Sequence, residues 1–69
     1  MIGYVKREKV LAELKREMEF NWNMQKRYGD LATTLKDPAM ARQHLEMQIE
    51  YIHRWSESSR IYNILKQMT

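Results

Sequence analysis

Glu50 and His53 have the spacing that comes closest to a known metal chemistry in this sequence. A Glu-x-x-His pair places a carboxylate and an imidazole on one face of a helix, as di-iron carboxylate bundles require. Such a site also needs a glutamate from a neighbouring helix, and Glu17 or Glu19 is the available donor. Helical periodicity, however, places Glu50 and His53 on a polar face with Arg42, away from the apolar residues. A solvated pair is therefore favoured over a metal site.

Groups for covalent or acid–base catalysis do not form a recognisable set. The 69 residues contain no cysteine, which excludes thiol nucleophiles, thiolate zinc sites and disulfides. No cysteine or second carboxylate accompanies His44 to complete a reactive set, and no glycine-rich phosphate loop occurs. A chain of this length is also too small to enclose a substrate pocket of about 300 Å³. The sequence predicts a protein that is not an enzyme and needs no cofactor.

The densest group of basic residues lies near the start of the chain and comprises Lys6, Arg7, Lys9, Lys15 and Arg16. Glu8 and Glu13 interrupt this group, and Lys26 and Arg27 follow it. Twelve Lys and Arg against nine Asp and Glu give a net charge of +3, which is mixed along the chain. A nucleic-acid footprint is normally clustered on one face. Nucleic-acid binding through these basic residues is therefore the alternative hypothesis and not the main one.

The elements that position these groups are α-helices, since helix-forming residues dominate and strand-like alternation is missing. Asp37 and Pro38 mark the clearest boundary, because aspartate is a good N-cap and proline suits the first position of a helix. One helix is predicted over residues 4–36 and a second over residues 38–68. Gly29 slightly favours a break or bend at residues 29–30 over an unbroken helix. The serines within residues 56–59 favour a bend that sets off a short third segment.

Two helices of similar length with a tight connection predict an all-α fold, an antiparallel helical hairpin in a single domain over residues 1–69. Apolar spacings of three and four residues predict the contact between the helices, made by Leu11, Leu14, Met18, Trp22, Leu45, Ile49, Ile52 and Trp55. Two helices alone cannot enclose a core, and a chain this short buries only about 60% of its unfolded surface. Association with another molecule is therefore the remaining source of stability.

Further apolar and aromatic residues flank the two stripes and predict an interface with a partner, formed by Val10, Met24, Tyr28, Met40, Met47, Tyr51 and Tyr62. Aromatic residues and methionine are enriched in interface cores. A symmetric homodimer that forms a four-helix bundle would bury these flanks. A different protein target is the alternative user of the same surface.

The missing catalytic chemistry and the surplus of apolar helix faces together predict a function in binding. We expect a small non-enzymatic protein–protein interaction module that serves as a regulator, inhibitor or adaptor. No stretch approaches the ~20 apolar residues of a membrane span. The absence of cysteine suits a reducing compartment. A cytoplasmic protein that does not associate with membranes is therefore expected.

Overall fold

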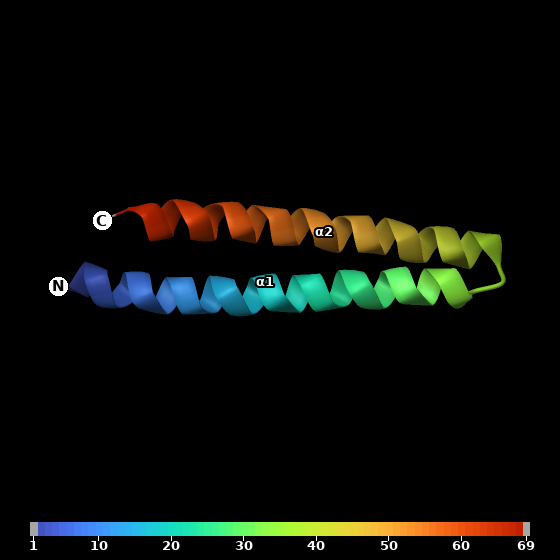
Figure 1. Cartoon of the computed structure of the whole chain (residues 1–69), viewed down its shortest axis with the longest axis horizontal. Coiled ribbons are helices and arrows are strands. Elements are labelled where there is room, and N and C mark those ends of the chain that lie inside the picture. The colour runs from blue at the N-terminus through green and yellow to red at the C-terminus, as the bar shows by residue number, and fades with distance from the viewer. Residues whose placement is uncertain (1, 69) are drawn as a thin grey trace.

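The chain folds into two long antiparallel helices, which lie side by side in the computed structural model (Figure 1). Helix α1 spans Ile2–Thr34 and helix α2 spans Pro38–Gln67. The structure describes residues 2–68, with side chains from residue 6 onward. The hairpin measures 55 × 14 × 12 Å, and the start of α1 and the end of α2 lie at the same end of it (Figure 1). The predicted all-α helical hairpin is confirmed.

Residues 35–37 connect the two helices, and the local sequence explains the turn. The Leu35 N–H still donates to the Leu31 carbonyl at 3.1 Å, as the last turn of α1 closes. Asp37 is extended, with φ −81° and ψ 117°, and its carboxylate accepts a hydrogen bond from the Ala39 N–H at 3.0 Å. Pro38 opens α2, where its missing N–H costs nothing. The predicted N-cap and helix start are confirmed.

Both helices are continuous, so α1 has no break at residues 29–30, and of the expected break or bend only a bend is compatible with the structure. Gly29 lies within the helix. It also lies next to the Gln48 side chain of α2, since a Cβ placed on Gly29 would be 2.5 Å from the Gln48 Nε2 atom. Glycine therefore leaves room for the Gln48 side chain against α1 instead of ending the helix. Helix α2 likewise continues through residues 56–59, and no separate third segment appears within residues 2–68.

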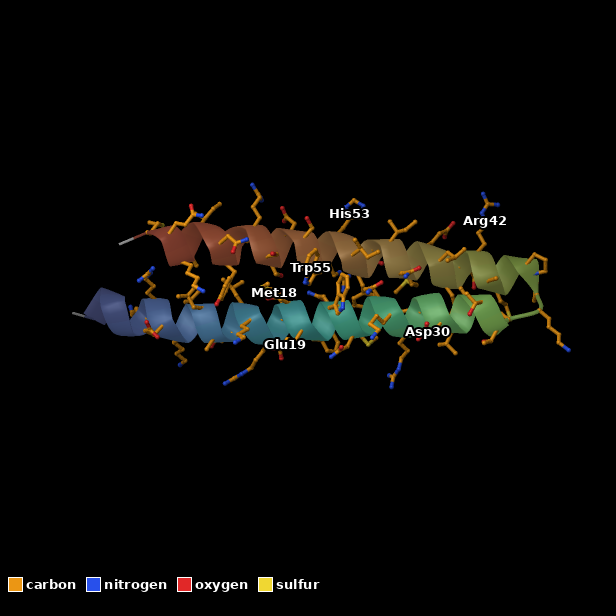
Figure 2. All side chains as sticks on the ribbon, in the orientation of Figure 1. Met18, Glu19, Asp30, Arg42, His53 and Trp55 are labelled. Carbon is orange, nitrogen blue, oxygen red and sulfur yellow. The ribbon has the colours of Figure 1, made fainter. Side chains whose placement is uncertain are left out.

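The helices meet along a seam whose residues are spaced alternately by four and three positions, as in a two-stranded coiled coil. On α1 these less exposed residues are Arg7, Leu11, Leu14, Met18, Asn21, Gln25, Tyr28, Ala32 and Leu35. On α2 they are Ala41, His44, Gln48, Tyr51, Trp55, Ser58, Tyr62 and Leu65. Figure 2 shows Met18 and Trp55 between the helices, whereas Arg42 and His53 point away from α1.

The most buried part of this seam is polar. Asn21, Gln25 and Ser58 are 3%, 6% and 5% exposed, and Ala32 is the one buried apolar residue in the described part of the chain. The Gln48 Nε2 atom donates to the Gln25 Oε1 atom at 3.0 Å. Asn21 Nδ2, by contrast, is buried without a hydrogen-bond partner among the described residues. The hairpin thus has specific polar contacts at its centre, and the side chains that the structure describes form no buried apolar core.

Half of the apolar contact predicted from the sequence lies outside this seam. Leu11, Leu14, Met18 and Trp55 belong to the seam. The other four predicted contact residues are exposed beside it, and they are Trp22, Leu45, Ile49 and Ile52. The physical reason is that a seam between two helices takes about two residues in seven from each helix. A wider apolar stripe cannot fit into it.

Replacing Gly29 and Gln48 together tests the close approach of the Gln48 side chain to Gly29. Alanine is favoured over glycine in a helix by about 1 kcal/mol. When Gln48 is present, however, the Cβ that Gly29→Ala adds displaces the Gln48 amide. The Gln25 oxygen then loses its hydrogen bond, and a buried oxygen left unpaired costs about 1–3 kcal/mol. We expect Gly29→Ala to be neutral or destabilising alone, and to stabilise by about 1 kcal/mol beside Gln48→Ala. Urea unfolding of all four proteins measures this coupling. Equal effects in both backgrounds would contradict it.

Arg7 joins the start of α1 to the end of α2. Its Nε and Nη2 atoms donate to the Leu65 carbonyl at 3.0 and 2.7 Å, and Nη2 also donates to the Lys66 carbonyl at 3.0 Å. These carbonyls belong to the last turn of α2, where helical acceptors lack an N–H donor four residues further along and carry partial negative charge. Arg7 therefore holds the open end of the hairpin together.

Removing this clamp is expected to destabilise the hairpin. Hydrogen bonds from a charged donor contribute about 1.5–3 kcal/mol, and partial exposure lowers the expected loss for Arg7→Ala to about 1–2 kcal/mol. Arg7→Lys should recover less than half of the stability that Arg7→Ala loses, because an ammonium group lacks the planar fork of the guanidinium group. Urea unfolding followed by circular dichroism checks this, with the exposed Arg16→Ala as control, expected within about 0.5 kcal/mol of wild type. Equal losses for Arg7→Ala and Arg16→Ala would rule out the clamp.

Candidate interaction surfaces

Large apolar side chains are exposed along most of the hairpin, at Val10, Phe20, Trp22, Leu31, Met40, Leu45, Ile49, Ile52, Ile61, Ile64 and Met68. The accessible surface is 5766 Å², whereas a globular protein of 8.4 kDa exposes about 4,600 Å². Neither helix, over its described length, has the long apolar run that crossing a bilayer requires. Large apolar side chains exposed in groups are a common feature of interaction surfaces.

The seam divides this surface into two faces. Both helices are right-handed and they run antiparallel. The residues that directly follow a seam residue, on either helix, therefore lie on one side of the hairpin, and the residues that directly precede a seam residue lie on the opposite side. The first side carries Trp22, Leu45, Ile49 and Ile52, which we call the tryptophan face. The second side, which we call the methionine face, carries Val10, Phe20, Met24, Leu31, Met40, Met47, Ile61 and Ile64.

The tryptophan face carries an open groove of about 550 Å³. Met18, Trp22 and Trp55 form its apolar wall, and the two indole rings lie 5.0 Å apart between centroids, at 49° to each other. Lys15 and Glu19, which carry opposite charges, border the groove together with an asparagine. The face thus combines a hollow between two tryptophans with a ridge of exposed aliphatic side chains on α2.

The methionine face also has a groove, of about 440 Å³, but this one is charged. Glu17, Glu50, Arg54 and Glu57 contribute to its lining. Arg54 Nη2 lies 2.8 Å from Glu50 Oε1, and its guanidinium carbon lies 5.1 Å from the centre of the Tyr51 ring. The charged groove therefore separates the apolar residues of this face into a group near the connection and a group near the chain ends.

The structure brings the suggested metal-binding residues close together without forming a ligand set. Glu17, Glu50 and His53 all line the charged groove, whereas Glu19 borders the groove on the other face. The Glu50 carboxylate is engaged by Arg54. Among the described side chains, no three His, Cys, Asp or Glu residues are arranged to hold a metal ion. The interaction that the structure shows for Glu50 is a solvated ion pair with Arg54.

Four of the seven residues predicted to form a partner interface share the methionine face. Val10 and Met40 are exposed, and Met24 and Met47 are half-buried at the edge of the seam. All four stand one position before a seam residue. Their role as an interface remains a prediction.

The three tyrosines of the predicted interface lie in the seam between the helices. Tyr28 and Tyr51 stack with ring centroids 5.7 Å apart and planes at 14°. His44 lies 5.6 Å from Tyr28, and its ring nitrogen Nδ1 is 2.9 Å from the Met40 carbonyl oxygen. Tyr62 is half-buried further along α2. These rings are therefore already used, at least on one side, in packing α1 against α2.

The tryptophan face was missed as a surface by sequence reasoning. Its aliphatic residues have regular helical spacing, which normally indicates burial between helices. The signal that distinguishes them is the alternate spacing of four and three that runs through Asn21, Gln25 and Tyr28. Extending that register identifies the polar seam and leaves the aliphatic stripe outside it.

The basic residues of α1 do not share a face. Arg7 is bonded to the end of α2. Lys6 precedes a seam residue and Lys15 follows one, so these two lie on opposite sides of the hairpin. Lys9 and Arg16 are exposed on the outer side of α1. The charge is thus spread around α1 and not gathered as in a nucleic-acid footprint.

In comparisons with known proteins, no family model matches the chain, and no curated protein or solved structure is significantly similar to it. The function proposed for the hairpin therefore rests on its two faces and their grooves.

Proposed function

We propose that this chain is a cytoplasmic, non-enzymatic protein–protein interaction module that forms a homodimer and regulates, inhibits or adapts a protein target. The observation that supports this is the methionine face, on which eight large apolar side chains flank a charged groove. Large apolar side chains that gather on one face of a small soluble protein often mark a surface that another molecule covers. The target is proposed to bind on this face.

The chemistry of the methionine face suits an amphipathic helix with a basic residue. Met24, Met40 and Met47 have unbranched, adaptable side chains, which fit the irregular surface of a bound helix. The groove between the apolar groups is lined by three glutamates, at positions 17, 50 and 57, and by Arg54. Its excess of negative charge would pair with a lysine or arginine of the target.

Site-specific photo-crosslinking in cells that make the protein tests this function. A photoreactive residue placed at Met40 or Ile64 should crosslink a discrete protein, whereas one placed at Glu46, on the outer side of α2, should not. The crosslinked protein is then purified and titrated with the hairpin. We expect Met40→Glu to weaken binding by about 30-fold or more, because it places a charge in the apolar contact, while Glu46→Gln leaves it within twofold.

Two results would contradict the proposed target site. One is crosslinking of the same proteins from Met40 and Glu46, which would indicate unspecific contact. The other is a purified complex whose affinity is unchanged by Met40→Glu and by Ile64→Glu. Circular dichroism of each variant confirms that the hairpin remains helical.

Nucleic acid is the alternative partner. Lys9, Arg16 and the other basic residues of α1 would contact phosphates, and binding would then weaken steeply with salt. Titration of duplex DNA and of RNA at 50 and 200 mM salt distinguishes the alternatives. Affinity that falls by 10³-fold or more, together with a loss on Lys9→Gln and Arg16→Gln, would favour nucleic acid over a protein target.

A further inference from the structure

The tryptophan face lies on a hairpin whose described side chains form no buried apolar core. Asn21, Gln25 and Ser58 occupy the buried centre, and Ala32 is the one buried apolar residue in the described part of the chain. A chain of this size without disulfides usually needs another source of apolar burial in order to stay folded. A copy of the same chain is always present where the protein is made. It therefore suits this role better than a separate target.

The surface area of the hairpin agrees with what a stable dimer needs. Its 5766 Å² exceed the roughly 4,600 Å² of a globular protein of equal mass by about 1,200 Å² per chain. A standard protein interface buries about 800 Å² per partner. The excess is therefore large enough for a second copy to cover one side of the hairpin.

We infer that a second copy of this chain covers the tryptophan face, so that two hairpins form a symmetric four-helix bundle. This inference rests on the homodimer of the proposed function and names its interface. A two-fold contact requires a self-complementary surface. The tryptophan face has both parts, because the ridge formed by Ile49 and Ile52 lies beside the groove between Trp22 and Trp55.

The symmetry axis runs parallel to the hairpin in this arrangement. Such an axis places α2 of each copy over α1 of the other, and the ridge of one copy then faces the tryptophan groove of its partner. Ile52 precedes Trp55 by one helical turn, and Trp55 contacts Trp22. The ridge and the groove thus lie at nearby levels along the hairpin, which brings them together when one copy is rotated onto the other.

Charge favours the tryptophan face over the methionine face for this contact. The groove between the tryptophans is bordered by one lysine and one glutamate, Lys15 and Glu19, so its charges compensate. The groove of the methionine face has three glutamates and one arginine in its lining. Self-association there would bring two sets of like charges together, which is unfavourable when water is excluded.

Two matched isoleucine variants test the assignment. Ile49 and Ile64 lie on the same helix and are 53% and 51% exposed, but they belong to opposite faces. Sedimentation velocity of the full chain at 1–200 µM should show a wild-type dimer with a Kd of about 10 µM or tighter. Ile49→Glu should weaken dimerisation by about 100-fold or more, since a charge is buried, whereas Ile64→Glu should change it less than threefold.

Tryptophan fluorescence supplies a second readout that does not depend on the glutamate variants. Trp55→Phe leaves Trp22 as the single tryptophan of the chain. On dilution, its emission should shift to longer wavelength and become accessible to iodide as the dimer dissociates. A wild-type dimer that survives Ile49→Glu but dissociates with Ile64→Glu would overturn the assigned face and leave the homodimer intact. A compact wild-type monomer at 200 µM would overturn the homodimer itself, whatever the crosslinking at Met40 shows.

Discussion

Asn21→Leu is expected to raise the free energy of unfolding by about 1–3 kcal/mol, although it removes a native polar side chain from the centre of the hairpin. Asn21 is 3% exposed, and its Nδ2 atom has no hydrogen-bond partner among the described residues. A buried polar group without a partner costs about 1–3 kcal/mol, and a leucine at the same place avoids this cost while burying apolar surface. The melting temperature should rise by about 4–8 °C per kcal/mol.

Arg16 provides the control for this experiment. Arg16 is exposed on the outer side of the same helix and lines neither groove, so Arg16→Leu should change the stability by no more than about 0.5 kcal/mol. Both variants are unfolded in urea at one fixed protein concentration, because self-association would otherwise shift the midpoint. A loss of stability with Asn21→Leu would mean that the amide has a partner, such as a bound water or a second chain.

Polar residues in a coiled-coil seam also restrict how the helices pair. A single asparagine at such a position can fix register at a cost in stability. Asn21, Gln25 and Gln48 lie on facing helices, and the hydrogen bond between the two glutamines requires one particular alignment. Asn21→Leu leaves this hydrogen bond in place, so the more stable variant should keep the native alignment, seen as a single set of amide resonances in the middle of both helices.

The overall fold could be predicted from the sequence because its determinants are local. Asp37 and Pro38 define the start of α2 through an N-cap bond and a fixed proline φ, and both depend on adjacent residues alone. Glu50 and Arg54 form an ion pair because helical geometry brings positions four apart together. Such effects act within a few residues along the chain.

The packing of α1 on α2 could not be predicted in the same way. A stripe such as Leu45, Ile49 and Ile52 shows that one side of α2 avoids water, but it does not show which molecule covers that side. Gly29 was misjudged for a related reason, since its role depends on Gln48 of the other helix. Arg7 was assigned to a basic surface although its partners are carbonyls 58 and 59 positions away. Contacts between distant residues decide all three cases.

The two tryptophans show how closely the seam and the proposed dimer are linked. Trp55 is half-buried in the seam and Trp22 is exposed on the tryptophan face, yet their rings are in contact. Removing the Trp55 ring should lower the stability of the hairpin itself. Removing the Trp22 ring should mainly weaken association, because Trp22 borders the surface that a second copy is proposed to cover.

Trp55→Ala is accordingly expected to lower the free energy of unfolding by about 2–4 kcal/mol, below the full loss for a buried tryptophan because the ring is partly exposed. Since a small domain has only about 5–15 kcal/mol in total, the variant should lose much of its helical circular dichroism near 37 °C. Trp55→Phe keeps an aromatic ring against Trp22 and should cost about 1 kcal/mol. Urea unfolding at two protein concentrations separates folding from association. If Trp55→Ala and Trp55→Phe were equally stable, the indole would not hold the helices together, and the polar seam alone would account for the hairpin.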